Sequence, residues 1–323
     1  MMRPFLLAFT VIGSITLSGP VTAQNYPVRP VRVIVPFAAG GGLDIVLRPL
    51  FQKMSENVQQ NFILDFRPGA NGIIGTEIGA KAPPDGYTLV AATSGTITIN
   101  PNVYAKLPFD VARDLAPVTK VGDAPFVMVV HPSLAARNVR EFVALAKRRP
   151  GELTYGSAGI GGSNHMGGAY FLQQTGIRLE HVPYKGSQPL MTNLMIGEVI
   201  MGFDSIMATV PWIRAGRLRA LGIAAEKRSP VAPEIPTIAE AGGPELIIGS
   251  FYGLLAPAGT PRDIIAKLHA EVVKALSIPE LRGRYVSTGL EPVGSSPEQF
   301  VTEIRDDTAR WGKVARAANV HAD

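Results

Sequence analysis

The sequence predicts an α/β fold in two domains, each built on a mostly parallel sheet flanked by helices. Short apolar, β-branched runs alternate with helical patterns along the chain, and such alternation is typical of parallel strands joined by helical crossovers. Glycine-rich loops follow several of the predicted strands, as they do at strand-to-helix turns of α/β proteins. A chain of 323 residues exceeds one comfortable hydrophobic core, which favours two domains over one.

The first residues have the layout of a secretory signal peptide. Arg3 supplies a positive start, residues 5–17 form an apolar run, and residues 21–23 form a small-residue cleavage site. The apolar run is short for a membrane span. We therefore expect cleavage after Ala23 and an exported, soluble chain that begins at Gln24.

Composition excludes several classes of function. The chain has no cysteine, which rules out disulfides, thiolate metal sites and cysteine nucleophiles. The net charge of +5 is mild and spread along the chain, so it gives no argument for nucleic acid as a partner. The five histidines lack metal-ligand spacing, and neither a phosphate P-loop nor a complete dinucleotide fingerprint occurs. We expect no metal and no cofactor.

A strand, a glycine loop and a helix start open the folded part of the chain. Residues 31–35 are predicted to form a buried strand, and apolar residues between 43 and 54 fall on one face of a helix. The loop 36–44 between them contains three consecutive glycines, which exceed what a tight turn needs. A ligand anion at the helix N-terminus is therefore favoured over an empty turn. We expect the N–H groups of Gly41 and Gly42 to bind it, because a Cβ there would clash with the anion or forbid a positive φ.

The remaining elements follow from apolar runs, caps and prolines. Further strands are predicted at 62–66, 87–92, 126–131, 153–157, 180–183, 199–203 and 218–224. Further helices are predicted at 76–81, 166–175 and 188–196, after the cap Asn138, and from Thr260-Pro261 and Ser296-Pro297. Pro49 lies inside the first helical stripe and is expected to kink that helix or delay its start.

Loops rich in Gly, Ser and Thr at strand ends form the candidate ligand site. Ligands of open parallel sheets bind outside the carboxyl ends of the strands. Such loops offer backbone N–H and hydroxyl donors, which suit a carboxylate without a paired arginine. The candidate ligand-binding residues are Phe37, Ala39, Gly41, Gly42, Leu43, Asp44, Thr93, Ser94, Ser157, Gly159, Ser163, His165, Tyr184, Lys185, Gly186 and Asp204.

Three charged candidates have ordinary structural explanations as well. Asp44 suits a helix N-terminus, and we favour that role over ligand contact. For Asp204 the structural and ligand-binding roles have equal weight. Lys185 is more often a solvated loop lysine than an anion ligand.

A hydrolase is the enzyme alternative. Ser157 or Ser163 with His165 could supply a nucleophile and its base. The glycine that a nucleophile elbow needs is replaced by Tyr155, and no orienting acid is evident. A loop that donates hydrogen bonds to a ligand is therefore favoured over a catalytic one.

Several sequence motifs resemble the Bug-type extracytoplasmic solute receptors of tripartite tricarboxylate transporters. Each motif alone is weak, but their order and spacing together are highly specific. The matching segments are 26–32 (YPVRPVR), 35–41 with Asp44, 67–72 (RPGANG), 84–89 (PDGYTL), 182–187 (VPYKGS), 236–242 (PTIAEAG) and 256–261 (APAGTP). They extend over nearly the whole chain beyond the signal peptide.

The resemblance implies a two-domain periplasmic binding protein, type II-like, that closes on a ligand in the interdomain cleft. Its ligands would be di- or tricarboxylates, amino acids or aromatic acids, held between the loops 36–44 and 157–165, partly through water. The family usually has a small hydroxyl residue where this chain has Leu43, a difference that favours a less polar acid. Catalytic residues are not implied.

The resemblance and the βα alternation together suggest how the chain divides. Domain 1 is expected to comprise 24–121 and 225–323, and domain 2 to comprise 122–224. The expected partners are a small carboxylate and the membrane components of a tripartite tricarboxylate transporter, and the receptor is expected to be a monomer in the periplasm. A carboxylate-sensing signalling module is the third alternative.

Overall fold

The computed structural model describes residues 26–322 and places ten strands of that segment in one continuous sheet. The order of the main strands is β2-β1-β3-β9-β4-β7-β5-β6, and β8 and β10 pair with β4. The bounds are β1 Val31–Val35, β2 Phe62–Phe66, β3 Thr88–Thr93, β4 Leu115–Val130, β5 Thr154–Ser157, β6 Glu180–Pro183, β7 Met201–Ser205, β8 Arg219–Ile223, β9 Gly249–Pro257 and β10 Glu291–Pro292.

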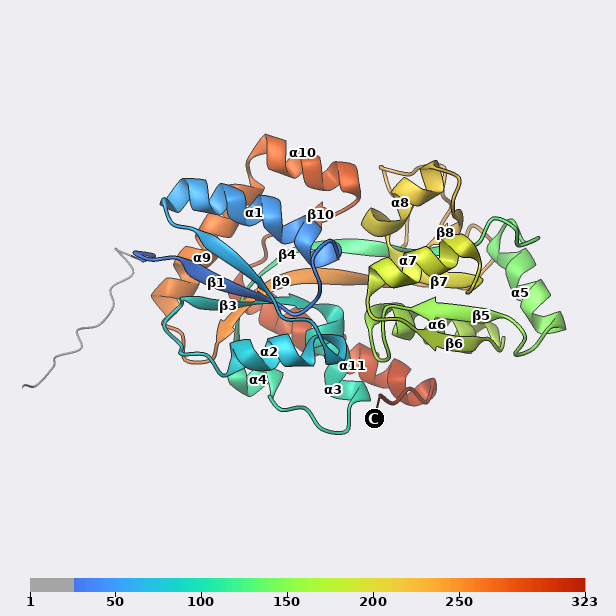
Figure 1. Cartoon of the computed structure of the whole chain (residues 1–323), viewed down its shortest axis with the longest axis horizontal. Helices are drawn as coiled ribbons and strands as arrows, with labels where there is room; N and C mark the ends of the chain where they lie inside the picture. Colours follow the sequence, from blue (N-terminus) through green and yellow to red (C-terminus); the bar gives the residue numbers. More distant parts are fainter. Residues whose placement is uncertain (1–25, 323) are drawn as a thin grey trace, which may run out of the picture.

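The helices cover both faces of this sheet (Figure 1). Their bounds are α1 Gly42–Val58, α2 Ile73–Ala80, α3 Asn100–Val103, α4 Val111–Asp114, α5 Val139–Arg148, α6 Ser163–Thr175, α7 Ser187–Ile196, α8 Ile206–Arg214, α9 Arg262–Leu276, α10 Pro279–Thr288 and α11 Pro297–Ala317. A 3₁₀ turn, η2 (Ala70–Gly72), precedes α2, and a π-helical turn, η3 (Gly95–Ile99), precedes α3.

Strand β4 divides the sheet into two parts. Its residues 115–125 pair antiparallel with β9, and its residues 126–130 pair antiparallel with β7 and β8. The first part holds the parallel pairs of β1 with β2 and β3, and the second holds those of β5 with β6 and β7. Figure 1 shows the two parts as two lobes with β4 and β9 running between them.

The α/β fold class is confirmed, with mostly parallel outer strands flanked by helices in each lobe. The two central strands β4 and β9 run antiparallel to their neighbours, an addition that the sequence pattern did not predict. The proposed division at residues 122 and 225 stays a prediction. The chain leaves the first part within β4 and returns to it at Gly249, where β9 begins.

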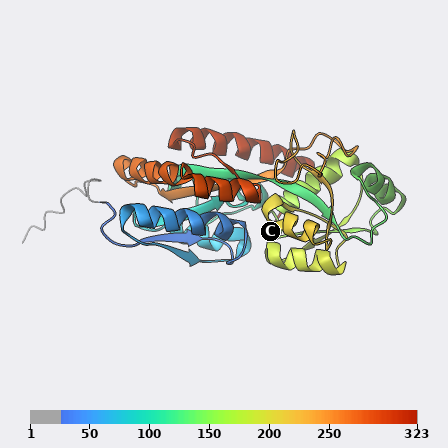
Figure 2. The same cartoon turned by 90° about the horizontal axis from the view of Figure 1, so that it is seen from above.

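The apolar core lies on both faces of the sheet. One cluster joins α1, α9 and the neighbouring face of β4, including Leu50, Leu268 and Val127. The opposite faces hold two further clusters, one around Phe142 and one around Phe300. The long helix α11 takes part in both of the latter, because its early residue Phe300 packs in one cluster and its later residue Trp311 in the other. Figure 2 shows α11 (red) lying along the long axis of the molecule.

Several predicted boundaries differ from those in the structure. The strand predicted at 126–131 is the end of β4, which begins at Leu115. The helix predicted from residue 166 begins at Ser163, and the predicted loop 93–96 already turns helical at Gly95. The helix α1 begins at Gly42 despite Pro49, so the expected delay of its start is wrong. The cap at Asn138 is confirmed, since its side chain accepts a hydrogen bond from the Glu141 N–H at 2.8 Å.

None of the helices within residues 26–322 combines the length and apolar character that crossing a membrane requires. The predicted signal peptide and its cleavage site lie outside the described residues.

Replacing Phe300 tests the packing of α11 on the first part of the sheet. This side chain is fully buried, and its ring meets that of Phe251 edge-on at 5.3 Å and 88°. Phe300→Ala should lower the free energy of unfolding by about 3–5 kcal/mol, because a cavity replaces the ring. Val301→Ala is the control on the same helix; Val301 is 52% exposed, and its loss should cost less than about 0.5 kcal/mol. Urea unfolding measures both, and equal losses would contradict the packing described.

Candidate functional site

Two helix N-termini lie at the ends of parallel strands. The loop after β1 leads into α1 at Gly42, and the loop after β5 leads into α6 at Ser163. The first turn of a helix leaves N–H groups without intrahelical acceptors, and the helix dipole makes that end favourable for an anion. Both ends begin with Gly caps that provide no side-chain hydrogen bond to the helix. These N–H groups are therefore the natural anion donors of the fold.

The loop 36–44 is held by Asp44. Its Oδ2 accepts a hydrogen bond from the Gly40 N–H at 2.9 Å, and its Oδ1 lies 2.7 Å from Arg48 in an ion pair. Gly40 has a φ of +82°, which favours glycine. Gly41 instead has a φ of −83°, so the expected positive φ at Gly41 is wrong. The nearest atom to a Cβ built on Gly41 is 3.6 Å away, and the protein has room for a side chain there.

Position 42 has room only for glycine because of Tyr252, a residue that was not among the candidates from the sequence. A Cβ on Gly42 would lie 2.5 Å from the hydroxyl of Tyr252, on β9. Tyr252 is buried, which raises the pKa of its phenol, and its hydroxyl contacts the Ser205 side chain. Tyr252 thus connects the start of α1 with the start of α8. No strand was predicted at Gly249–Pro257, although its residues 251–257 (FYGLLAP) form an apolar run that is a strand signal, and Tyr252 was missed for that reason.

Asp204 is buried at the end of β7, between two helix N-termini. Its carboxylate accepts hydrogen bonds from the Ser187 hydroxyl and, at 2.7 Å, from the Ser205 N–H. Burial raises the pKa of Asp204, while these hydrogen bonds act in the opposite direction. These contacts are all within the protein, and they are sufficient to explain a buried carboxylate.

The loop 157–165 is held by two histidines. The Ser157 hydroxyl lies 2.7 Å from His181 Nε2 and accepts a hydrogen bond from the Gly159 N–H at 3.2 Å. His165 Nδ1 accepts a hydrogen bond from the Gly161 N–H at 3.0 Å. The two imidazoles stack with centroids 3.9 Å apart and an interplanar angle of 3°. The nucleophile–base pair considered for Ser157 and His165 is therefore not formed, because Ser157 contacts His181 instead.

Loops from the two parts of the sheet are in contact near the starts of α1 and α6. Gln188 Nε2, at the start of α7, donates a hydrogen bond to the Gly40 carbonyl at 3.2 Å. The side-chain oxygen of Asn71 is 3.3 Å from a Cβ built on Gly162. A Cβ built on Gly95 would lie 3.5 Å from the Ser163 hydroxyl. The loops 36–44, 67–72, 93–96 and 157–165 thus form one cluster, as the strand-end reasoning predicted for most of them.

The other candidate residues differ in their contacts with this cluster and in their exposure. Tyr184 and Gly186 are tied to the 157–165 loop, because their N–H groups donate to the carbonyls of Ser157 and Ala158. Phe37 lies beside Gly72, and Ala39 and Lys185 are exposed. Thr93 exchanges hydrogen bonds with Thr96.

The side chains of Leu43 and Ser94 do not face the cluster of loops. Leu43 is 3% exposed and belongs to the apolar core, so it does not present the apolar surface that was expected of it. The Ser94 hydroxyl accepts a hydrogen bond from the Phe251 N–H at 3.1 Å and faces β9.

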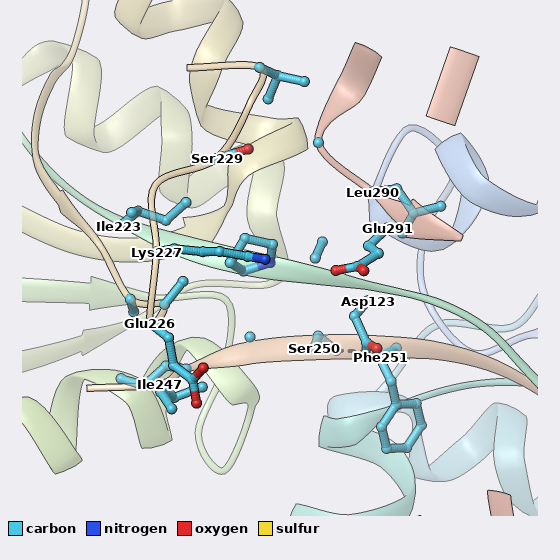
Figure 3. Close-up of a pocket in the computed structure, with 18 of the residues that line it drawn as sticks. Asp123, Ile223, Glu226, Lys227, Ser229, Ile247, Ser250, Phe251, Leu290 and Glu291 are labelled. Carbon is cyan, nitrogen blue, oxygen red and sulfur yellow. Dashed lines mark hydrogen bonds between the residues drawn. The ribbon is translucent and has the colours of Figure 1, made fainter. Parts of the chain in front are cut away.

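A separate hollow of about 590 Å³ lies where β4 and β9 pass between the lobes (Figure 3). Figure 3 shows Lys227 reaching from one side of it toward Glu291 on the other, with Asp123 nearby. Ser94 lines this hollow, but the other candidate ligand residues do not. Within residues 26–322, no group of three or more acidic or histidine side chains is arranged to hold a metal ion.

The fold is that of periplasmic binding proteins, and comparison with known proteins identifies the family. The family model for the "Tripartite tricarboxylate transporter family receptor" matches residues 46–320. BugT of Bordetella pertussis is 35% identical over 306 residues, 94% of each chain. The chain therefore belongs to the tripartite tricarboxylate transporter receptor family, as its motifs predicted.

Two solved structures are similar over nearly their whole length. A protein of R. palustris solved with adipate is 35% identical, with a TM-score of 0.89, over 92% of this chain and 99% of that one. MatC from Rhodopseudomonas palustris, solved with bound malate, is 31% identical, with a TM-score of 0.84, over 90% and 99% of the two chains.

The stacked histidines predict a pH dependence of stability. Burial lowers the pKa of His165 to about 3, with His181 contributing, and that of His181 to about 4. Both values lie below the unfolded value of about 6.5, so the unfolded chain binds more protons between about pH 6.5 and 4. Stability is therefore lost as pH falls through that window. Urea unfolding from about pH 7 to about pH 4 should show a shallower pH slope for His181→Phe than for the wild type, and equal slopes would contradict the prediction.

Proposed function

We propose that this chain is a periplasmic receptor that captures a small carboxylate for the membrane components of a tripartite tricarboxylate transporter, without catalysing a reaction. The observation that carries the proposal is the pair of glycine-capped helix N-termini, α1 and α6, in one cluster of loops. Membership of the receptor family and relatives solved with adipate and malate support it.

A carboxylate suits the donors of this cluster. The N–H groups at the start of α1 and α6 are neutral donors, and hydrogen bonds to an ionised acceptor are stronger than those between neutral groups. Among the basic side chains in and beside these loops, Arg48 pairs with Asp44, Arg67 pairs with Asp65, and Lys185 is exposed. We propose that Gly41, Gly42 and Ser163 lie against the ligand carboxylates, and that the receptor acts as a monomer.

The hydrolase alternative has little geometric support. Ser157 is fully buried and its hydroxyl contacts His181 and the Gly159 backbone. No carboxylate of residues 26–322 has a described hydrogen bond to either stacked imidazole, so the third member of a triad is not supplied. A signalling module would share the same site, and transport assays in a deletion strain would separate it from a transport receptor.

A thermal-shift screen tests the proposed function. Adipate, malate, citrate, glutamate and benzoate would be added to the purified chain, with the corresponding amides as uncharged controls. A true ligand at about 100 times its Kd stabilises the folded state by about 2.7 kcal/mol. Stabilisation by at least one acid, none by its amide, and full recovery of the acid after incubation would support a receptor. Consumption of the acid, or no stabilisation by any carboxylate, would contradict it.

Gly41→Val tests the anion position without straining the loop. The φ of Gly41 is negative and the nearest atom is 3.6 Å from a Cβ built there, so the backbone accepts a side chain at this position. A hydrogen bond to a charged group is worth about 1.5–3 kcal/mol, and losing two should weaken binding by about two to four decades. The matched control is Gly283→Val, because Gly283 in α10 has no atom within 4 Å of its Cβ and so likewise has room for a side chain.

Calorimetric titration with the acid found in the screen measures both variants. Near wild-type affinity in a folded Gly41→Val protein would place the anion elsewhere. Asp44→Asn is the companion variant: its oxygens already contact Gly40 and Arg48, so affinity should fall by less than about tenfold.

We also propose that the signal peptide is cleaved after Ala23. The positive start, the apolar run and the small residues before that position motivate the proposal. Intact-mass analysis of the periplasmic protein should give a chain beginning at Gln24. A mass that includes residues 1–23 would refute it.

A further inference from the structure

The N–H groups of the 157–165 loop fall into two sets. Those of Gly159 and Gly161 are occupied by protein acceptors, the Ser157 hydroxyl and His165 Nδ1. Those of Ser163, Asn164 and His165, at the start of α6, have no acceptor within the helix, whereas the Met166 N–H already donates to the Gly162 carbonyl. The occupied set determines the shape of the loop, and the other set is available to a ligand.

Two glycines with positive φ shape this loop, and such flexible residues keep one conformation only where contacts hold them. Gly159 has a φ of +148° and Gly161 a φ of +74°. One further bond, from the Gly162 N–H to the Gly159 carbonyl at 3.2 Å, closes the turn. Three hydrogen bonds, at 3.2, 3.0 and 3.2 Å, thus hold two left-handed glycines in place just before a helix N-terminus.

The histidines that support the loop come from two different elements. His165 belongs to the first turn of α6, and His181 belongs to β6. β6 pairs in register with β5, so His181 lies opposite Tyr155, whose ring stacks on it at 4.8 Å. The two imidazoles, 3.9 Å apart, therefore join α6 to the sheet directly beneath the loop.

The surroundings keep both imidazoles neutral. His165 Nδ1 accepts a hydrogen bond, which requires an unprotonated nitrogen. The elements α6, α7 and β5 contain no Asp, Glu, Lys or Arg, and the titratable group facing the rings from β5 is Tyr155. Glu180 precedes His181 on β6 but is exposed. A neutral acceptor at this place adds no cation that would compete with the helix end for the ligand.

We propose that His165 and His181 together are positioning residues, which fix the 157–165 loop so that the N–H groups at the start of α6 meet the ligand carboxylate. This inference rests on the proposed function and extends it. The residues need not touch the ligand. His165 acts through the Gly161 N–H, and His181 acts through Ser157 and through the stack with His165.

The first test uses ligand-free, ¹⁵N-labelled protein and needs no carboxylate. Amide hydrogen exchange of Gly161 should be at least tenfold faster in His165→Leu than in the wild type, because leucine has no acceptor. His165→Gln, whose side-chain oxygen can accept from a nearby backbone N–H at this position of a helix, should restore most of the protection. The matched control is His131→Phe, a histidine outside the stack that contacts Ser133. Unchanged exchange in His165→Leu would overturn the proposal.

The second test measures binding of adipate by calorimetry. His181→Phe keeps an aromatic ring in the stack but loses the contact with Ser157, so affinity should fall roughly three- to tenfold. Ser157→Ala should weaken binding more than His181→Phe does, because it removes the contact with His181 and also the acceptor of the Gly159 N–H. His165→Leu should weaken binding and His165→Gln should restore it. Loss of affinity in both His165 variants alike would indicate a merely structural role and would overturn the proposal.

The two tests separate this inference from the proposed function. If Gly161 is protected as described but no carboxylate binds the wild type, the loop support stands and the receptor function fails. If adipate or another acid binds tightly while His165→Leu leaves Gly161 exchange and affinity unchanged, the receptor function stands and the positioning role fails.

Discussion

The antiparallel pairing of β4 with β9 is the constraint on which the rest of the molecule depends. Residues 115–125 of β4 bond to β9, and its next five residues bond to β7 and β8. A single strand of 16 residues, about 50 Å long, therefore belongs to both parts of the sheet. Because this ladder is common to the two lobes, the loops after β1 and β5 come together on one side of it, where Gln188 reaches Gly40.

The acidic side chains in the cluster of loops have partners within the protein, and the backbone N–H groups at the starts of α1 and α6 remain as neutral donors. Asp44 is neutralised by Arg48 and accepts from Gly40, while Asp204 is buried against Ser187 and Ser205. Backbone dipoles at helix ends can then balance an anion without a counter-ion, and they need no reorganisation because the loops are fixed by the protein. This division between occupied and available N–H groups connects the fold to the proposed carboxylate site.

Local patterns predicted the strand–loop–helix units well, because each depends on residues that are neighbours in sequence. They did not predict the first eleven residues of β4, where Pro117, Gly122 and Pro125 interrupt the apolar pattern. Prolines are unusual in central strands, and the register shifts of β4 accommodate two of these residues. His181 was missed because its contacts depend on strand order, which short-range periodicity does not contain. Tyr252 was missed because the apolar run at Gly249–Pro257 was not assigned as a strand.

The last described residues are part of the support of the 157–165 loop. The Ala322 N–H donates to the Val103 carbonyl at 2.9 Å, and a Cβ on Gly161 would lie 3.5 Å from the Ala322 side chain. The segment that contains Ala322 thus lies against this loop, although the ribosome makes it more than a hundred residues later. During synthesis the 157–165 loop therefore lacks this neighbour until α11 and the residues after it have been made.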